Sequence, residues 1–215
     1  MRKDARHLPL AEKLPDGSYQ RTWYDSENKQ QPTKEYLYWH KINTRCKAHY
    51  QINRPSYIGY KVSKLFSEYD NFVEWCRKSE WFYTEGYSLD KDLLCKALGK
   101  VEYSEHTCVF VPLEINGFLT MKRSNVKTYT GVSFQQGCQK YIVSCSQLNG
   151  KNKTLARTTC PVEGYSIYRA EKVRLAKILS LSYAGKVDQR VTDILADFDK
   201  YIDLFTVNPK NKGVK

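Results

Sequence analysis

The chain has 215 residues and a formal net charge of +12, with 41% hydrophobic and 27% charged residues. This composition, with a mean hydropathy of −0.64, excludes a membrane protein, since no apolar run approaches the ~18 residues that a span requires. The seven cysteines include no Cys-x-x-Cys pair, which favours a reduced protein of the cytoplasm over a disulfide scaffold.

The positive charge is concentrated in the second half of the chain. Residues 1–116 hold 18 Lys+Arg and 16 Asp+Glu, whereas residues 117–215 hold 17 and 7, which gives +2 and +10. Such a basic half predicts a polyanionic partner, because each phosphate neutralised by Lys or Arg releases a counterion. The alternative is a set of solvated lysines that serve solubility.

The first half is expected to begin with an arm and two helices. Residues 1–31 carry little pattern and are predicted to be poorly ordered. Thr33 is placed to cap a helix over residues 34–46. A loop is expected over residues 49–61, and apolar residues at helical spacing predict a second helix over 62–78.

A strand–loop–strand–helix unit follows. "YSLD" (Tyr87 to Asp90) is predicted to be a strand, residues 91–100 a loop and "TCVFV" (107–111) a second strand. A helix is expected to begin at Pro112, because proline is tolerated in the first helical turn. Residues 122–128 are basic and polar and are interpreted as a connector between domains.

After the connector, three short strands are predicted at "GVSFQQ", "KYIVSCSQ" and "KTLAR", with turns at Gly137 and Asn149-Gly150. Two helices are expected over residues 162–183 and 188–205. Alternation along the strands predicts which side chains pack on the longer helix: Val132, Phe134, Ile142 and Leu155.

The strand–loop–strand–helix unit suggests a one-metal hydrolytic site. Asp90 at a strand end and Asn116 on the following helix are candidate ligands, and His106 is a candidate third group or base. The alternatives are a solvated charged turn for Asp90-Lys91-Asp92, a surface histidine, and an asparagine that caps or packs.

"GYSLDKDLL" and "VEYSEHTCVFVPLEIN" resemble the HNH (ββα-metal) endonucleases, which are often phage-encoded. The resemblance implies a divalent ion, Mg²⁺ or Mn²⁺, on Asp90 and Asn116, phosphodiester cleavage assisted by His106, and the host cytoplasm as the location. Lys91 stands where this family places its general-base histidine. A lysine at its usual pKa of ~10.4 is a poor base at neutral pH.

Residues 130–198 are similar to the DNA-binding domain of plant ethylene-response factors, which often follows an HNH unit in phage proteins. That family lays a three-stranded sheet in the major groove. The resemblance implies contacts to double-stranded DNA from Ser133, Gln135, Lys140, Tyr141, Ser144, Lys153 and Arg157. Ala156 departs from the family, which has a glycine at that place.

Together these observations predict an α+β protein with four regions: an arm (1–31), an HNH-like ββα unit with a helical lead-in (32–121), an ethylene-response-factor-like domain (129–205) and a basic tail (206–215). Three functions remain open. They are a metal-dependent DNA endonuclease, a catalytically inactive nuclease fold that binds DNA or a host protein, and a protein-binding module.

Overall fold

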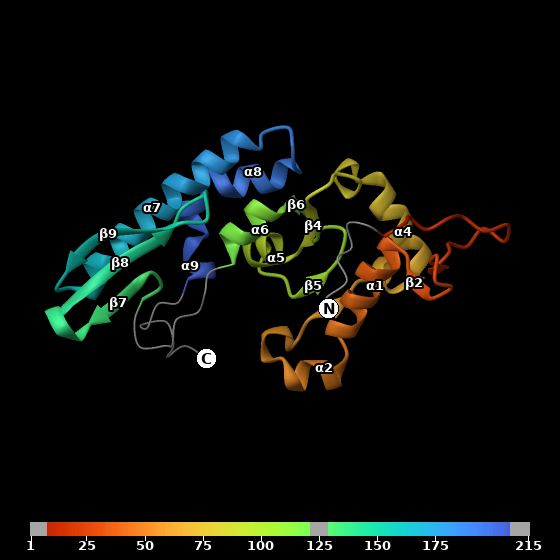
Figure 1. Ribbon diagram of the computed structural model, residues 1–215, viewed down its shortest axis with the longest axis horizontal. Helices are drawn as coiled ribbons and strands as arrows, with labels where there is room; N and C mark the ends of the chain where they lie inside the picture. Colours follow the sequence, from red (N-terminus) through yellow and green to blue (C-terminus); the bar gives the residue numbers. More distant parts are fainter. Residues whose placement is uncertain (1–7, 121–128, 207–215) are drawn as a thin grey trace. The chain divides into compact units, whose positions relative to one another are not determined.

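A computed structural model describes residues 8–120 and 129–206 of the chain. The protein is a mixed α+β structure with small sheets (Figure 1). It divides into two compact units, Met1–Pro112 and Leu113–Lys215. The division therefore falls before the helix that follows Pro112. The predicted connector at 122–128 and most of the predicted tail lie outside the described residues.

The segment expected to be a loose arm is attached to the first unit. It contains a hairpin of β1 (Thr22–Tyr24) and β2 (Gln30–Pro32). The Ala11 backbone N–H donates to the buried carboxylate of Glu35 at 3.0 Å, and the Tyr19 N–H donates to Asp70, also at 3.0 Å. The Glu35 and Asp70 side chains thus accept hydrogen bonds from backbone N–H groups of the arm and hold it to the unit. The local sequence of the arm does not predict these contacts.

Four α-helices follow the hairpin: α1 (Lys34–Arg45), α2 (Ala48–Asn53), α3 (Lys64–Ser67) and α4 (Tyr69–Lys78). The prediction for α1 is confirmed, and the Thr33 side chain accepts from the Tyr36 N–H as a cap. The loop expected over 49–61 was wrong in part, because α2 occupies its first half. The single helix expected over 62–78 is interrupted at Glu68, which has an extended backbone.

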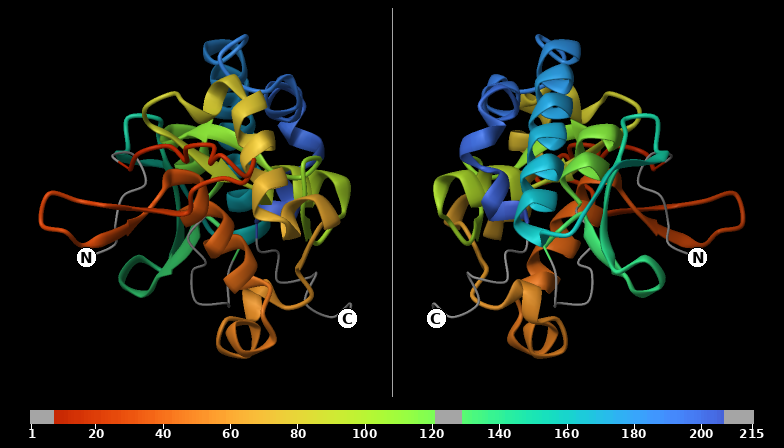
Figure 2. Two further views of the ribbon diagram at one scale, coloured as in Figure 1. Left: turned by 90° about the vertical axis from the view of Figure 1, so that its right-hand side faces the viewer. Right: turned by 90° about the vertical axis from the view of Figure 1, so that its left-hand side faces the viewer.

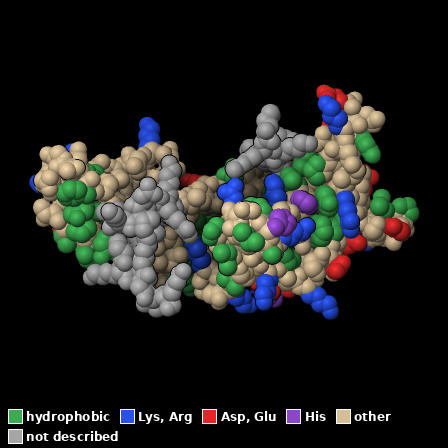
Figure 3. Space-filling model, turned by 90° about the horizontal axis from the view of Figure 1, so that it is seen from below, with side chains coloured by type: hydrophobic (Ala, Val, Ile, Leu, Met, Phe, Trp, Pro, Cys, Tyr) green, Lys and Arg blue, Asp and Glu red, His purple; other side chains and the backbone are tan. Residues whose placement is uncertain are grey.

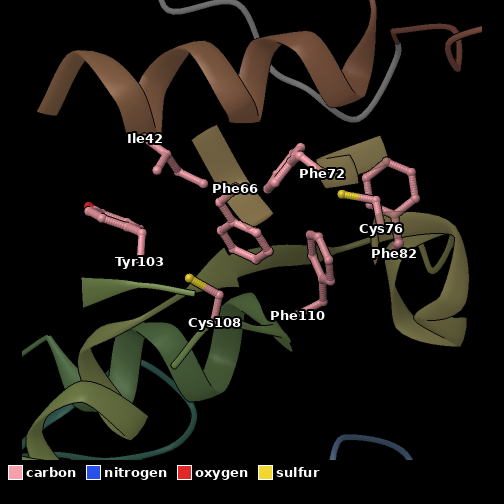
Figure 4. Packing of buried hydrophobic residues seen from close by; sticks show 8 residues of the cluster. All are labelled: Ile42, Phe66, Phe72, Cys76, Phe82, Tyr103, Cys108 and Phe110. Carbon is pink, nitrogen blue, oxygen red and sulfur yellow. The ribbon is translucent and has the colours of Figure 1, made fainter. Parts of the chain in front are cut away.

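The main core of the first unit is aromatic. Figure 4 shows Ile42 projecting from α1 toward Phe66. Tyr103, Cys108 and Phe110, from residues 103–110, pack in the same cluster. Phe66, Phe72 and Phe110 are at most 2% exposed. The ring pairs meet edge-on or tilted, the arrangement that aromatic quadrupoles favour.

The two strands predicted for the strand–loop–strand–helix unit are formed, but Pro112, expected to begin the helix, is the last residue of the second strand. Strand β4 (Tyr87–Asp90) pairs antiparallel with β6 (Val109–Pro112), as the two predicted strands require. The expected loop between them is instead helix α5 (Asp92–Leu98) followed by β5 (Glu102–Tyr103), which pairs in parallel with β3 (Lys61–Val62). Helix α6 (Leu113–Leu119) follows β6 in the chain and belongs to the second unit.

The second unit is a sheet covered by a long helix (Figures 1 and 2). The predictions of three strands and a helix are confirmed as β7 (Val132–Gln135), β8 (Lys140–Ser146), β9 (Asn152–Thr158) and α7 (Pro161–Ser182). The sheet is antiparallel in the order β7-β8-β9. The helix expected over 188–205 is broken into α8 (Gln189–Ala196), a 3-10 turn and α9 (Ile202–Phe205).

Within the described parts of the chain, none of the helices is both long and apolar enough to span a membrane.

Candidate functional site

Asp90, the first predicted metal ligand, ends strand β4 and is only 6% exposed. Its Oδ2 accepts a hydrogen bond from the Leu93 N–H at 3.0 Å, so it caps the first turn of α5. Burial raises the pKa of this carboxyl to about 6, against the lowering effect of the Leu93 hydrogen bond. One of the two carboxylate oxygens is therefore engaged in holding a helix.

Lys91, which stands at the family's general-base position, is 7% exposed and lies among tyrosines. Its Nζ is 3.9 Å from the ring centroid of Tyr60 and 5.4 Å from that of Tyr103. The ammonium also forms an ion pair with the exposed carboxylate of Asp92. Burial opposes the charge, but Asp92 and the tyrosines outweigh it and raise the pKa of Lys91 above its usual value. An ammonium held in this way cannot accept a proton near neutral pH.

The remaining predicted catalytic residues, His106 and Asn116, lie on other elements than Asp90. His106 lies on the turn before β6 with its side chain 69% exposed, and its Nε2 is 3.6 Å from a Glu105 oxygen. Asn116 lies on α6, in the other unit. Nowhere in residues 8–120 and 129–206 do three His, Cys, Asp or Glu side chains gather as a metal would require. One Asp90 oxygen already accepts from a backbone N–H, and the described residues around it form no cluster of the several ligands that a divalent ion needs.

The sheet of the second unit has one face turned to α7. Gly164 of α7 lies so close to the strands that a Cβ there would be 3.1 Å from Val143 and 3.3 Å from Val132. Val132 and Val143 face each other across β7 and β8 and are at most 3% exposed. Because side chains alternate along a strand, their neighbours lie on the opposite side of the sheet.

We call this opposite side the outer face and define it by Ser133, Gln135, Lys140, Ile142 and Arg157. Ser133, Ile142 and Arg157 form one cross-strand row, and Gln135 faces Lys140 in the next. All but Ile142 are exposed. Four of the seven predicted DNA-contacting residues are thus brought together on one surface. Ile142, predicted to pack on the helix, lies on this face instead, and Val143 is the packed residue.

The other three predicted contacts differ. Tyr141 lies opposite Phe134 and Thr158, on the α7 side, and its ring is 5.0 Å from that of Phe134. Phe134 remains 47% exposed although it was predicted to pack on the helix. Lys153 pairs with the buried Cys145 and interacts electrostatically with Glu171 of α7. Ser144 follows a register shift in β8 and is half-buried.

The strands of the sheet and the turns between them carry charge of one sign. Residues 129–160 contain four Lys+Arg and no Asp or Glu. Lys140 and Arg157 make no ion pair within the described part of the chain. On the face drawn in Figure 3, Lys and Arg side chains are dispersed among uncharged ones. The absence of acidic residues from the sheet is therefore better evidence for an anion-binding surface than the net charge of the chain. By the same criterion Lys151, an exposed residue of the β8–β9 turn, belongs to this surface, although the sequence prediction left it out.

A scan against models of known protein families finds no match, and searches of curated proteins and of solved structures find none either. The assignment of a function therefore depends on the geometry of this chain.

Proposed function

We propose that the protein binds double-stranded DNA through the outer face of the β7-β8-β9 sheet. The supporting observation is that Ser133, Gln135, Lys140 and Arg157 are exposed on one face of a sheet whose strands carry no acidic residue. A narrow antiparallel sheet fits the major groove, where amide and hydroxyl groups can reach base edges. Lys140 and Arg157 would neutralise phosphates at the rim of the groove.

In this proposal the first unit does not hydrolyse DNA. Asp90 caps a helix and Lys91 is held by Asp92 and tyrosine rings, so both groups at the position of the nuclease signature have structural roles. The protein then matches the second of the three functions, a DNA-binding protein on an inactive nuclease-like unit. The endonuclease is the competing proposal.

The test of DNA binding is a fluorescence anisotropy titration of a labelled duplex against salt concentration. Replacing both Lys140 and Arg157 with Gln should weaken binding at low salt and reduce the slope of log K against log[salt] by about 2, since each phosphate contact contributes about 0.9. The matched control, Lys64→Gln with Lys177→Gln, removes two charges from exposed positions that are not part of the sheet. Equal losses in the two double variants would show that only net charge matters and would contradict the proposed face.

A plasmid assay separates binding from cleavage. Supercoiled plasmid incubated with the protein and Mg²⁺ or Mn²⁺ should remain supercoiled, because Lys91, at the base position, is held as an ammonium by Asp92. Metal-dependent nicking that disappears in Asp90→Ala would favour the endonuclease and overturn this part of the proposal.

A further inference from the structure

The second unit contains a cavity apart from the outer face. Its volume is about 550 Å³, within the range of roughly 300–1,000 Å³ that is usual for small-molecule sites. The lining comes from α6, from Thr130 and Gly131 before β7, from the end of β8 and its turn, and from α7. The lining includes the rings of Phe118 and Tyr168 and the buried ammonium group of Lys172. Its hydroxyl groups come from Thr130, Ser144 and Ser146.

Lys172 is an unusual residue in this wall. It is 5% exposed and follows Tyr165 and Tyr168 along the buried stripe of α7, where an apolar side chain is expected. Its Nζ donates to the Phe118 carbonyl oxygen at 2.9 Å and lies 3.5 Å from the centroid of the Phe118 ring. An ammonium has three donors, and this carbonyl accepts from one of them.

No carboxylate balances this charge. Among the described residues Lys172 forms no ion pair. Glu114 also lines the cavity, but its Oε2 accepts from the Tyr183 hydroxyl at 2.6 Å. Burial lowers the pKa of Lys172 to about 8, so the side chain is mostly charged at neutral pH in spite of its surroundings. A buried charge without a counter-charge is costly, and an anion in the cavity would supply the missing partner.

We propose that this cavity is a binding site for a small anionic ligand, a carboxylate or a phosphate ester, whose charge pairs with the ammonium group of Lys172. The hydroxyl group of Ser144 provides a further donor, and the rings of Phe118 and Tyr168 provide apolar contact for the rest of the ligand. This site is separate from the DNA-binding face, since Lys140 and Arg157 do not line the cavity.

The test is isothermal titration calorimetry of the full-length protein with inorganic phosphate, succinate, AMP and, as an uncharged counterpart of AMP, adenosine. At least one of the three anions should bind with a Kd below about 1 mM, and adenosine more weakly than AMP. Lys172→Met should weaken the anion at least about tenfold, because a charge-assisted hydrogen bond is lost. Lys177→Met removes a charge from an exposed position of the same helix and should leave binding unchanged.

A second variant blocks the cavity while keeping Lys172. Gly117 of α6 lines the cavity, and a Cβ added there meets no atom within 4 Å. Gly117→Leu should fold, because leucine is a better helix former than glycine, and it should also weaken the anion about tenfold or more. Three results would each overturn the proposal: no anion binds at about 10 mM, the anion binds equally to Lys172→Met, or Gly117→Leu binds as tightly as the wild type. Whether phosphate or succinate binds more tightly separates the two ligand classes.

Discussion

Lys91 and Lys172 are both nearly buried lysines, but their surroundings shift the two pKa values in opposite directions. Lys91 has an adjacent carboxylate, Asp92, and tyrosine rings on several sides, which more than offset the cost of burial. Lys172 has a carbonyl oxygen and one phenyl ring, which do not. The first lysine thus has a structural role in its unit, whereas the second has no carboxylate partner among the described residues.

The stability of the protein should report the state of Lys172. A folded-state pKa of about 8 lies below the ordinary value of 10.5, so the folded protein loses this proton before the unfolded chain does. The penalty is therefore present below pH 8 and is relieved as pH rises from about 8 to 10.5. At about 1.4 kcal/mol per pKa unit, the change is on the order of 3 kcal/mol.

Urea unfolding of wild type and Lys172→Met at pH 7 and pH 10 measures this difference. The methionine variant should be the more stable protein at pH 7, and its advantage should shrink at pH 10. An advantage that stays constant between the two pH values would show that Lys172 is not desolvated in the folded state.

At the scale of elements, α5 depends on Asp90. At pH 4, where Asp90 is uncharged, Asp90→Ala removes the acceptor for the Leu93 N–H and should cost about 1 kcal/mol, as the loss of a helix cap does. Asp90→Asn keeps an acceptor oxygen and should be tolerated. Because burial raises the Asp90 pKa from 3.8 to about 6, the wild type should lose stability relative to Asp90→Asn as pH rises from about 4 to 6, by on the order of 3 kcal/mol. Chemical unfolding at pH 4, 5, 6 and 7 checks both statements, and parallel curves for the two proteins would contradict a buried carboxyl.

Elements with clear alternation or helical spacing were predictable, and elements defined by tertiary contacts were not. Helix α7 and strands β4, β7, β8 and β9 lie close to where the sequence places them. Helix α5 was missed because its buried residues, Leu93, Leu94 and Cys95, are consecutive rather than three or four apart, and its end is set by Gly99 at φ 63°.

The candidate surface was partly predictable for a similar reason. In β8 both Ile142 and Val143 are apolar, so alternation alone does not decide which of them faces the helix, and Gly164 of α7 decides it through close packing against Val143. The resemblance to the ethylene-response-factor domain therefore implied Ser133, Gln135, Lys140 and Arg157, which share one face of the sheet, but also Tyr141, which lies on the other face. The cavity was not predictable from the sequence. Its sequence signal is one lysine in the apolar stripe of α7, and this lysine indicates a binding site only once the structure shows that α6 lines the same cavity.

At the scale of the whole molecule, the two units differ in charge as well as in structure. Residues 1–112 hold 18 Lys+Arg and 15 Asp+Glu, and residues 113–215 hold 17 and 8, which gives +3 and +9. Each unit also has its own core, aromatic in the first and built around α7 and α8 in the second. DNA binding is therefore expected to be a property of the second unit.

Fragments test this division and the place of its boundary. Residues 113–215 should fold and bind duplex DNA with a salt slope close to that of the whole chain, and residues 1–112 should bind weakly. A fragment that begins at residue 122 lacks α6, and with it the Phe118 ring that packs on Phe198 and the carbonyl that accepts from Lys172. That shorter fragment should melt at a lower temperature, because it exposes Phe198 and leaves a buried ammonium without its acceptor. Circular dichroism melts of the two fragments, followed by anisotropy titrations, measure both effects. Equal melting temperatures would place α6 with the first unit, and strong DNA binding by residues 1–112 would move the interface away from the sheet.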